Sequence, residues 1–240
     1  MEHNRIKRTV LLVTAGAVAY FVGFLSTTRS APAQTPARFD MKVREDFFAG
    51  LSGDSERLAR GMKVCDEVLA TDPKNADALV WHGAGIYFAA GQAFRSGDQA
   101  KGMELWTRGL KEMQTAVELA PDDPGTRIPR GATLLAGSRF LPDAEIAKPL
   151  LKDALGDYEH IYELQKPYFA TIGTHPRGEL LFGLAEGYSR FGNGEKAQMY
   201  FEQIKKDLPN TAYAKRADVW LTTKSLPANQ TGCVGCHVAN

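Results

Sequence analysis

The stretch from Gly178 to Thr211, GELLFGLAEGYSRFGNGEKAQMYFEQIKKDLPNT, has the pattern of two helices joined by a tight turn. Apolar residues recur at three- and four-residue spacing on both sides of Gly192-Asn193-Gly194, which is typical of two amphipathic helices. Pro209 cannot continue a helix, so we expect the second helix to end just before it. The same periodicity, broken by Gly, Asn and Pro, extends from Phe39 to Leu221 and predicts an all-α fold.

This stretch resembles a tetratricopeptide (TPR) repeat over its whole length, since the family has a period of about 34 residues and similar residue classes. The matching positions are Leu181, Leu184, Ala185, Tyr188, Gly192, Ala197, Phe201, Ile204 and Pro209. Ala185 and Ala197 are small where the paired helices should cross closely. Tyr188 and Phe201 should fill the wedge between them. The resemblance implies an α-solenoid in which each helix pair packs on its neighbours.

Two further repeat boundaries follow the same logic. Residues 72–79 look like the close of one repeat and the opening of the next, with Gly83 as the small crossing residue, and this second unit closes at Pro121. The unit is about 14 residues longer than the family's period, so we expect lengthened helices over 76–94 and 98–120.

The other parts of the repeat domain are less regular. A poorer unit spans 126–164, in which Pro149 marks a kink or a helix start near Lys148. Residues 211–222 should form a final capping helix, because the last repeat otherwise exposes an apolar face. Residues 39–222 are therefore predicted to be a TPR-like α-solenoid of about three to four helix pairs.

The chain's chemistry is indicated by the motif Cys233-Val-Gly-Cys-His237, in a tail over 223–240 that we expect to be flexible. C-x-x-C-H is the attachment signature of a c-type haem. Cys233 and Cys236 can each form a thioether to a haem vinyl group, and His237 then becomes the proximal ligand of the iron. One covalent haem c is therefore predicted. A disulfide, a zinc half-site or an unused motif are the alternatives, although zinc normally needs four ligands.

The tail alone is not expected to enclose a haem, because few residues follow the motif and the tether before it is polar. The haem then lies against the repeat domain or is covered by a partner. If it lies against the domain, His175, in the loop leading into the last repeat, is the first candidate for a distal ligand. His160, Met199 and Met103 are alternatives, and five-coordinate iron or a ligand from another subunit remain equally open.

The N-terminal region has the features of a targeting segment. Basic residues in 1–8 precede an uncharged apolar run of about 17 residues, and together they predict a signal peptide or signal-anchor helix over 1–25. The basic flank stays in the cytoplasm, so the rest is exported to the periplasmic side of a bacterial inner membrane. Cleavage near Ala33 would instead release a soluble periplasmic protein. Residues 26–38 read as a polar spacer.

Composition limits the function classes. The 29 basic and 28 acidic residues nearly balance, so nucleic acid is not an expected partner. The hydrophobic fraction of 44% is sufficient for a sizeable core. The sequence has no Ser-His-Asp order, phosphate loop or H-E-x-x-H motif, which makes an enzyme less expected than an electron carrier or a binding scaffold. A peroxidase with an open distal site is a minor alternative.

Several other residues are candidates for structural or binding roles. Six aromatic residues either line the groove of the solenoid or, as is more usual on helices, belong to its core. They are Trp81, Phe94, Trp106, Tyr162, Tyr168 and Phe169. Cys65 is predicted to be a buried, inert thiol and His82 a buried histidine with satisfied hydrogen bonds. Asp122 and Asp123 are predicted to be turn and cap residues.

These observations predict a membrane-anchored, exported TPR protein that carries one covalent haem. It would bind a redox complex through its groove and transfer single electrons at the tail. The alternative is a TPR scaffold or assembly factor of the cell envelope, whose tail is a structural disulfide or metal site.

Overall fold

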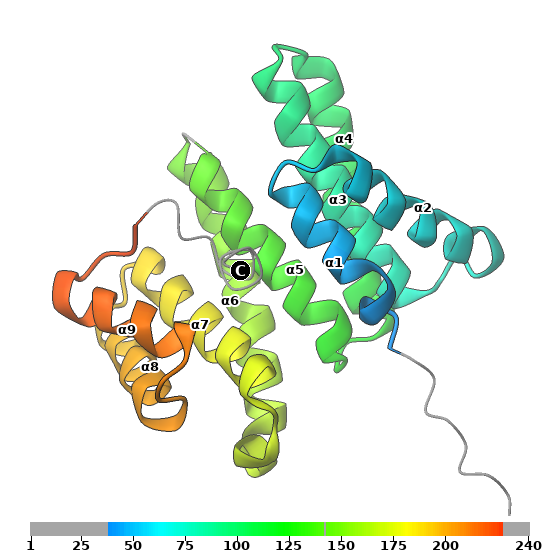
Figure 1. Ribbon diagram of the computed structural model, residues 1–240. Helices are drawn as coiled ribbons and strands as arrows, with labels where there is room; N and C mark the ends of the chain where they lie inside the picture. Colours follow the sequence, from blue (N-terminus) through cyan, green and yellow to red (C-terminus); the bar gives the residue numbers. More distant parts are fainter. Residues whose placement is uncertain (1–37, 142, 228–240) are drawn as a thin grey trace, which may run out of the picture. The chain divides into compact units, whose positions relative to one another are not determined.

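The structure is a computed structural model that describes residues 38–141 and 143–227 (Figure 1). These residues are helical and contain no strand, so the predicted all-α fold is confirmed. The α-helices are α1 (Asp40–Leu51), α2 (Ser55–Thr71), α3 (Ala76–Arg95), α4 (Gln99–Leu119), α5 (Pro124–Gly137), α6 (Ala144–Gln165), α7 (Thr174–Phe191), α8 (Gly194–Asp207) and α9 (Ala212–Thr223). Two 3₁₀ segments, η1 (Ser138–Phe140) and η2 (Lys166–Thr171), lie at the two ends of α6.

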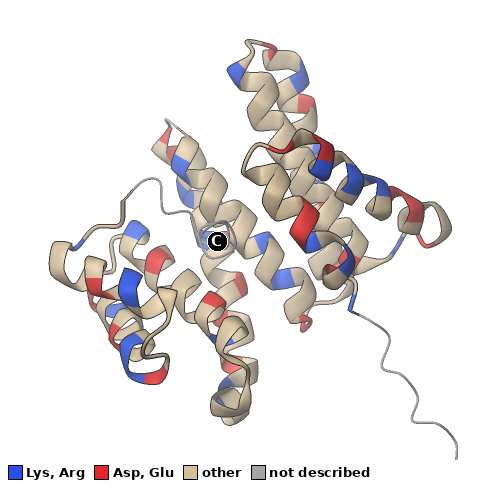
Figure 2. Cartoon of the chain, viewed as in Figure 1, with Lys and Arg blue, Asp and Glu red and all other residues tan. Residues whose placement is uncertain are grey.

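Charged side chains are mixed by sign along the helices. Figure 2 shows Lys and Arg interspersed with Asp and Glu rather than gathered into one region. Within the described ranges, this arrangement agrees with the near balance of charges in the sequence.

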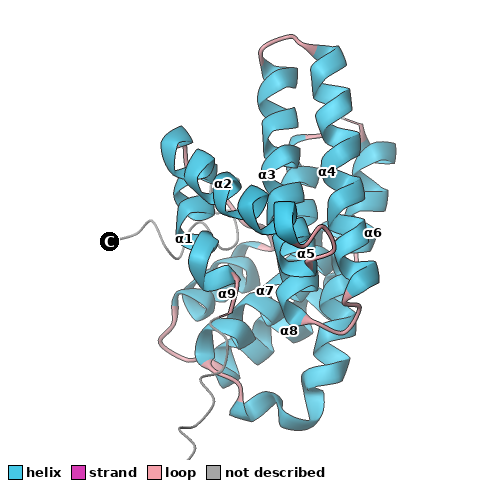
Figure 3. Ribbon diagram, turned by 90° about the vertical axis from the view of Figure 1, so that its right-hand side faces the viewer, coloured by secondary structure: helices cyan, strands magenta, loops and turns pink. Residues whose placement is uncertain are grey.

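Consecutive helices pack as antiparallel pairs joined by short connections (Figure 3). The pairs are α1 with α2, α3 with α4, α5 with α6, and α7 with α8, and α9 packs on α8. The first helix of each pair also contacts both helices of the preceding pair: α3 contacts α1 and α2, α5 contacts α3 and α4, and α7 contacts α5 and α6. The core is therefore built from contacts between neighbours in the sequence.

One type of turn recurs within three of the pairs. It contains a glycine with positive φ, which is +117° at Gly53 and +88° at Gly97 and Gly192. A side chain would strain this backbone conformation. The next residue is in each case the N-cap of the second helix, and its side chain accepts a hydrogen bond from the backbone N–H three positions later. These N-caps are Asp54, Asp98 and Asn193.

A second type of connection recurs between pairs. The residue that ends the helix has φ of −135° at Asp72, −136° at Ala120 and −131° at Leu208. Three positions later, an N-cap opens the next helix, and these residues are Asn75, Asp123 and Thr211. The predicted role of Asp123 as a cap is thus confirmed. The connections on either side of α6 depart from both types, since they run through η1 and η2.

The long helices predicted over 76–94 and 98–120 are confirmed as α3 and α4, which have 20 and 21 residues. They cross closely where Gly83 faces Gly109. A β-carbon built on Gly109 would lie 2.8 Å from the carbonyl oxygen of Gly83. The predicted role of Gly83 as a small crossing residue is therefore also confirmed.

The stretch 178–211 forms most of α7, all of α8 and the connection to α9. Most of its apolar residues are buried, and six of them have 0% exposure: Leu181, Leu184, Ala185, Ala197, Phe201 and Ile204. Helix α7 begins at Thr174, four positions before the predicted start. The predicted helix start near Lys148 is wrong, because α6 begins at Ala144 and contains Pro149.

The two ends of the chain lie outside the described residues. They include the predicted signal or anchor segment 1–25, the spacer up to residue 37, and the tail from residue 228 onward. Among the residues that are described, no helix is both long and apolar enough to cross a membrane.

Candidate functional site

The predicted haem-attachment residues Cys233, Cys236 and His237 lie outside the described residues. Within 38–141 and 143–227, no three His, Cys, Asp or Glu side chains gather in a way that could hold a metal ion. The candidate site is therefore the part of the repeat domain from which the tail departs, formed by α7, α8 and α9.

His175 lies in the first turn of α7 and its side chain is exposed. The expectation that it sits in a loop is wrong, because the helix begins one residue earlier, at Thr174. Its Nδ1 atom is 3.0 Å from the hydroxyl oxygen of Tyr213, in the first turn of α9. The same hydroxyl donates a hydrogen bond to Oε1 of Glu179, one turn after His175 on α7. His175, Tyr213 and Glu179 therefore form a connected cluster, which we call the α7–α9 cluster.

Hydrogen-bond chemistry fixes the direction of each contact in the α7–α9 cluster. An ionised carboxylate can only accept, so the single hydroxyl hydrogen of Tyr213 is directed to Glu179. Nδ1 of His175 must then donate to the Tyr213 oxygen. A neutral imidazole protonated at Nδ1 carries its lone pair on Nε2, and that is the nitrogen with which such a ring binds a metal.

Tyr213 is held in place by close packing against α7. It is 5% exposed, and a β-carbon built on Gly178 would lie 2.2 Å from its ring. Its ring centroid is 6.4 Å from that of Phe182. The guanidinium of Arg216, one turn along α9, lies 3.9 Å above the Phe182 ring, within the range of a cation–π contact. The hydroxyl that contacts His175 therefore belongs to a ring packed in the core.

The other predicted distal ligands lie on other surfaces. His160, on α6, has Nε2 at 2.7 Å from a carboxylate oxygen of Asp122. Met103 and Met199 are exposed by 58% and 50%, on α4 and α8. The structure brings none of these three side chains into the α7–α9 cluster.

His82 is a buried histidine with satisfied hydrogen bonds, as predicted. It is 5% exposed, with Nδ1 at 2.6 Å from Glu112 and Nε2 at 3.1 Å from Asp66. Burial opposes ionisation of Glu112, but hydrogen bonds from His82 and Arg108 outweigh it and hold the pKa of Glu112 below its usual range. Through these contacts the imidazole of His82 connects α2, α3 and α4, which indicates a structural role for this histidine.

Cys65 is buried, as predicted. It has 0% exposure, and burial, helped by the nearby carboxylates of Asp66 and Glu112, raises the pKa of its thiol to about 12. A thiol with so high a pKa is protonated and unreactive at neutral pH.

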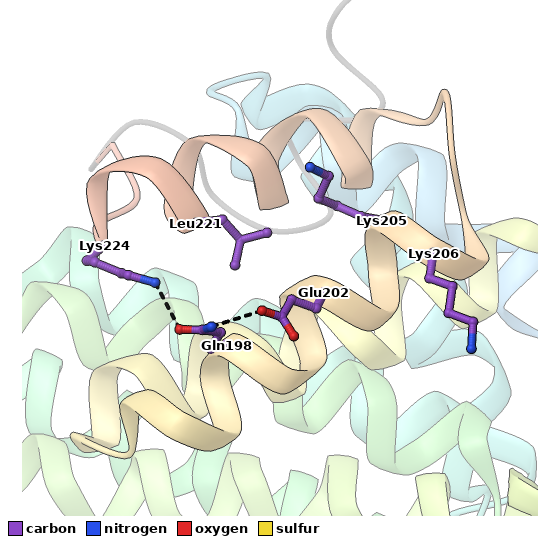
Figure 4. A pocket seen from close by; sticks show the side chains of 6 residues that line it. All are labelled: Gln198, Glu202, Lys205, Lys206, Leu221 and Lys224. Carbon is purple, nitrogen blue, oxygen red and sulfur yellow. Dashed lines mark hydrogen bonds between the residues drawn. The ribbon is translucent and has the colours of Figure 1, made fainter.

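A shallow groove of about 600 Å³ lies between α8 and α9 (Figure 4). Leu221 points into it, and the other five lining residues have polar side chains. Lys224 donates to Gln198 at 3.0 Å, and Gln198 in turn donates to Glu202 at 2.9 Å. Lys205 pairs with Asp218 on α9.

Two buried charge networks between helices were not anticipated from the sequence. Asp157 on α6, with 0% exposure, accepts hydrogen bonds from Arg127 and Arg130 on α5. Glu186 on α7, 2% exposed, pairs with Arg139 in η1 and with Arg190. These charges connect α5, α6 and α7 through buried contacts and offer no acid–base pair open to a substrate.

Most of the six aromatic residues considered for a groove belong to the core. Trp81 and Phe169 are each 8% exposed, and Trp106, Phe94 and Tyr162 pack partly buried in ring clusters. Tyr168 differs, with 52% exposure. The core interpretation therefore holds for Trp81, Trp106, Tyr162 and Phe169, whereas Phe94 is partly buried against the Trp106 ring.

No family model matches the chain, and neither the curated proteins nor the solved structures include a significant match to it.

Proposed function

We propose that this chain is an exported, membrane-anchored TPR-like protein that carries one covalent haem c and transfers single electrons to or from a partner redox protein. The observation that carries the proposal is the motif Cys233-Val-Gly-Cys236-His237. Two cysteines and an adjacent histidine in this order are the set that a c-type haem requires. A structural zinc site would need a fourth ligand beside these three residues.

The TPR-like solenoid is supported by the regularity of the connections. Within-pair turns with a left-handed glycine and an N-cap alternate with between-pair connections of nearly constant φ, as a repeated unit requires. The contacts of α3, α5 and α7 with both helices of the preceding pair fit the nearest-neighbour packing of solenoids. Helix α9 then has the position of a capping helix. We assign four helix pairs and this cap to the solenoid.

In this proposal the tail residues attach the haem and the solenoid surface binds the partner protein. Cys233 and Cys236 would hold the porphyrin through thioethers, which prevents its loss, and His237 would bind the iron from the proximal side. A haem held in this way supplies a one-electron Fe(III)/Fe(II) couple. The electron comes from, or goes to, a one-electron redox protein, which the solenoid surface binds.

The proposed location follows from the N-terminal segment and from the haem chemistry. The basic residues and apolar run of 1–25 predict export with an anchor in the inner membrane, and covalent haem attachment takes place on the periplasmic side. Cleavage near Ala33 would leave the same protein soluble in the periplasm.

The proposal is tested by a denaturing gel stained for covalently bound haem. The full chain is co-expressed with a cytochrome c maturation system, beside the double variant Cys233→Ala/Cys236→Ala and the control Cys65→Ala. We expect staining of the full chain and of Cys65→Ala, and its loss in the double variant. Staining that persists in the double variant, or is absent from the full chain, would refute the haem assignment.

A truncation after Leu226 separates the electron carrier from a scaffold. Removing the tail should leave the helical fold intact, because α9 ends at Thr223, and should abolish electron transfer. A truncated protein that retains its full activity in the cell would instead support an envelope scaffold in which the repeat domain alone acts.

A further inference from the structure

We infer that His82 connects the first helix pair to the second through a pH-dependent contact, which is closed while the imidazole carries two protons and opens when the ring loses one. The contact that opens is the one between His82 on α3 and Asp66 on α2. The inference does not depend on the proposed haem, because His82 and its partners Asp66 and Glu112 all lie in α2, α3 and α4. It adds a regulatory role to the structural role of this histidine.

Each ring nitrogen of His82 faces a carboxylate oxygen. Nδ1 lies 2.6 Å from Glu112, and Nε2 lies 3.1 Å from Asp66. The pKa of Glu112 is held below its usual range, so this carboxylate is ionised and only accepts hydrogen bonds. A neutral imidazole would direct a lone pair at one of the two carboxylates, whereas the imidazolium has an N–H for each of them. The arrangement therefore fits the doubly protonated ring.

The two contacts of His82 are unequal, and this decides which of them opens. The contact with Glu112 is the shorter one, and Arg108 donates to the second oxygen of the same carboxylate at 2.8 Å. The Glu112 side chain is 18% exposed, whereas that of Asp66 is 65% exposed. A ring that loses one proton should therefore keep its Nδ1–H for Glu112 and leave a lone pair on Nε2 facing Asp66. The exposed Asp66 side chain can then turn into water, which opens the contact between α2 and α3.

Two opposing effects act on the charge of His82. The residue is 5% exposed, and burial disfavours a charged imidazole. In the other direction, the imidazolium and Arg108 together balance the two carboxylates, whereas a neutral ring leaves one negative charge uncompensated. Cys65, next to Asp66 on α2, stays neutral because burial raises the pKa of its thiol to about 12. Helices α1 and α5 also pack on α3, and none of their described charged side chains forms an ion pair with His82. Histidine is the side chain that changes charge around neutral pH, so the contact should respond in that range.

The contact lies where the first helix pair joins the second. Helices α1 and α2 pack on each other, and both also contact α3. Apolar contacts at this junction, such as that of Phe47 with Trp81, whose ring centroids are 5.2 Å apart, do not depend on pH. Loss of the contact between His82 and Asp66 should therefore loosen the junction without detaching the first pair. The stabilisation is present at low pH and is lost as the pH rises through the titration of the imidazole.

Nuclear magnetic resonance of the full chain in a mild detergent tests the protonation of the ring. Long-range proton–nitrogen correlations distinguish a doubly protonated imidazole from each neutral tautomer, and the His82 ring is assigned through its own backbone, so that no His82 variant is needed. We expect both ring nitrogens of His82 to carry protons at pH 6. At pH 8.5 the ring should be neutral, with its proton on Nδ1, the nitrogen that faces Glu112.

Hydrogen exchange measured by mass spectrometry tests the contact itself. We compare the wild type with Asp66→Ala and with the matched control Glu67→Ala, since these neighbouring side chains on α2 are 65% and 64% exposed. At pH 6, Asp66→Ala should speed the exchange of the α1 and α2 amides about two- to fivefold, the effect of losing a partly exposed ion pair. At pH 8.5 it should differ little from Glu67→Ala. The amides of α7 and α8 should not change and serve as the internal reference.

Each contrary result overturns the inference. A ring that stays neutral at pH 6 shows that the imidazolium does not form, and a ring that stays doubly protonated at pH 8.5 makes the contact permanent. A neutral ring with its proton on Nε2 assigns the pH-dependent contact to Glu112 instead of Asp66. An effect of Asp66→Ala that is the same at both pH values, or no larger than that of Glu67→Ala at pH 6, shows that the contact does not hold α2 in a pH-dependent way. None of these results bears on the proposed haem.

Discussion

Replacing Asp157 with alanine should lower the free energy of unfolding by about 3–5 kcal/mol, the usual cost of breaking a buried ion pair by removing one partner. The carboxylate has 0% exposure and accepts three hydrogen bonds, at 2.6 and 2.7 Å from Arg130 and at 2.8 Å from Arg127. Arg130 is itself only 8% exposed, so the substitution leaves a guanidinium in the core without its carboxylate. The loss is therefore that of an uncompensated buried charge.

The pKa of Asp157 shows what the intact network contributes. Burial raises the pKa of this carboxyl, and the hydrogen bonds and charges of Arg130 and Arg127 only partly oppose the rise. A carboxyl whose pKa is raised in the folded state gives a stability contribution that is present at low pH and is lost as the pH rises through that folded pKa. At neutral pH the ionised network is thus not a net source of stability, although breaking it is costly.

Removing one partner of the network should therefore destabilise the protein, whereas removing all three charges together should not. Asp157→Ala should lower the urea midpoint by roughly 1–2.5 M, for an m-value of about 2–3 kcal/mol/M. The triple variant Asp157→Leu/Arg127→Met/Arg130→Met, which removes all three charges, should recover most of that loss. Unfolding is followed by far-ultraviolet circular dichroism at neutral pH. The control is Asp153→Ala, at an exposed position one turn earlier on α6, which should change the stability by less than about 0.5 kcal/mol. Equal effects of Asp157→Ala and Asp153→Ala would refute the reasoning.

Further predictions concern α2 to α4. Gly109→Ala should cost about 1–3 kcal/mol in urea unfolding, because its β-carbon would lie 2.8 Å from backbone atoms of α3. The control Gly156→Ala, with nothing within 4 Å, should instead gain about 0.5–1 kcal/mol, and a loss there as large as at Gly109 would contradict this explanation. Because the pKa of Glu112 is lowered, its contribution to stability is present above the ordinary value of 4.5 and is lost as the pH falls through the lower folded pKa. Glu112→Gln should therefore unfold with a flatter acid dependence than the wild type, and identical acid profiles would exclude this contribution. Cys65 should escape alkylation by iodoacetamide in the native protein at pH 8 and react fully in urea, as measured by mass spectrometry; native labelling would show that it is accessible.

Sequence reasoning located the helices wherever the signals are local. The positions of α3 and α4, the crossing at Gly83 and the burial of Cys65 all follow from periodicity, turn residues and residue size. Each depends on residues that lie within a few positions of one another.

Prolines caused the errors in helix starts. The residue before a proline usually avoids helical geometry, which favoured a loop at His175. However, proline is tolerated in the first turn, where its missing N–H has no partner in the helix, and Pro176 occupies that turn. At α6 the start signal was Asp143, whose side chain caps the helix several residues before Pro149.

The charge networks and the α7–α9 cluster were missed for a different reason. Asp157 falls on the apolar stripe of α6, at three- and four-residue spacing from Ala154 and Ile161, so its burial could have been suspected. Its partners lie 27 and 30 positions away, and no local pattern identifies them. The pairing of His175 with Tyr213 spans 38 positions and likewise depends on how α9 packs on the preceding helices.

The connections at 72–75, 120–123 and 208–211 begin with nearly the same φ, so helix pairs could be added to the domain between them. A helix pair that starts and ends on equivalent connections can be copied without a new junction. A second copy of residues 76–123 placed after Asp123 would enter and leave through backbone geometry that the chain already uses. The domain can therefore be lengthened by whole pairs, so that the distance between its first helix and the surface bearing His175 becomes an adjustable property of the protein.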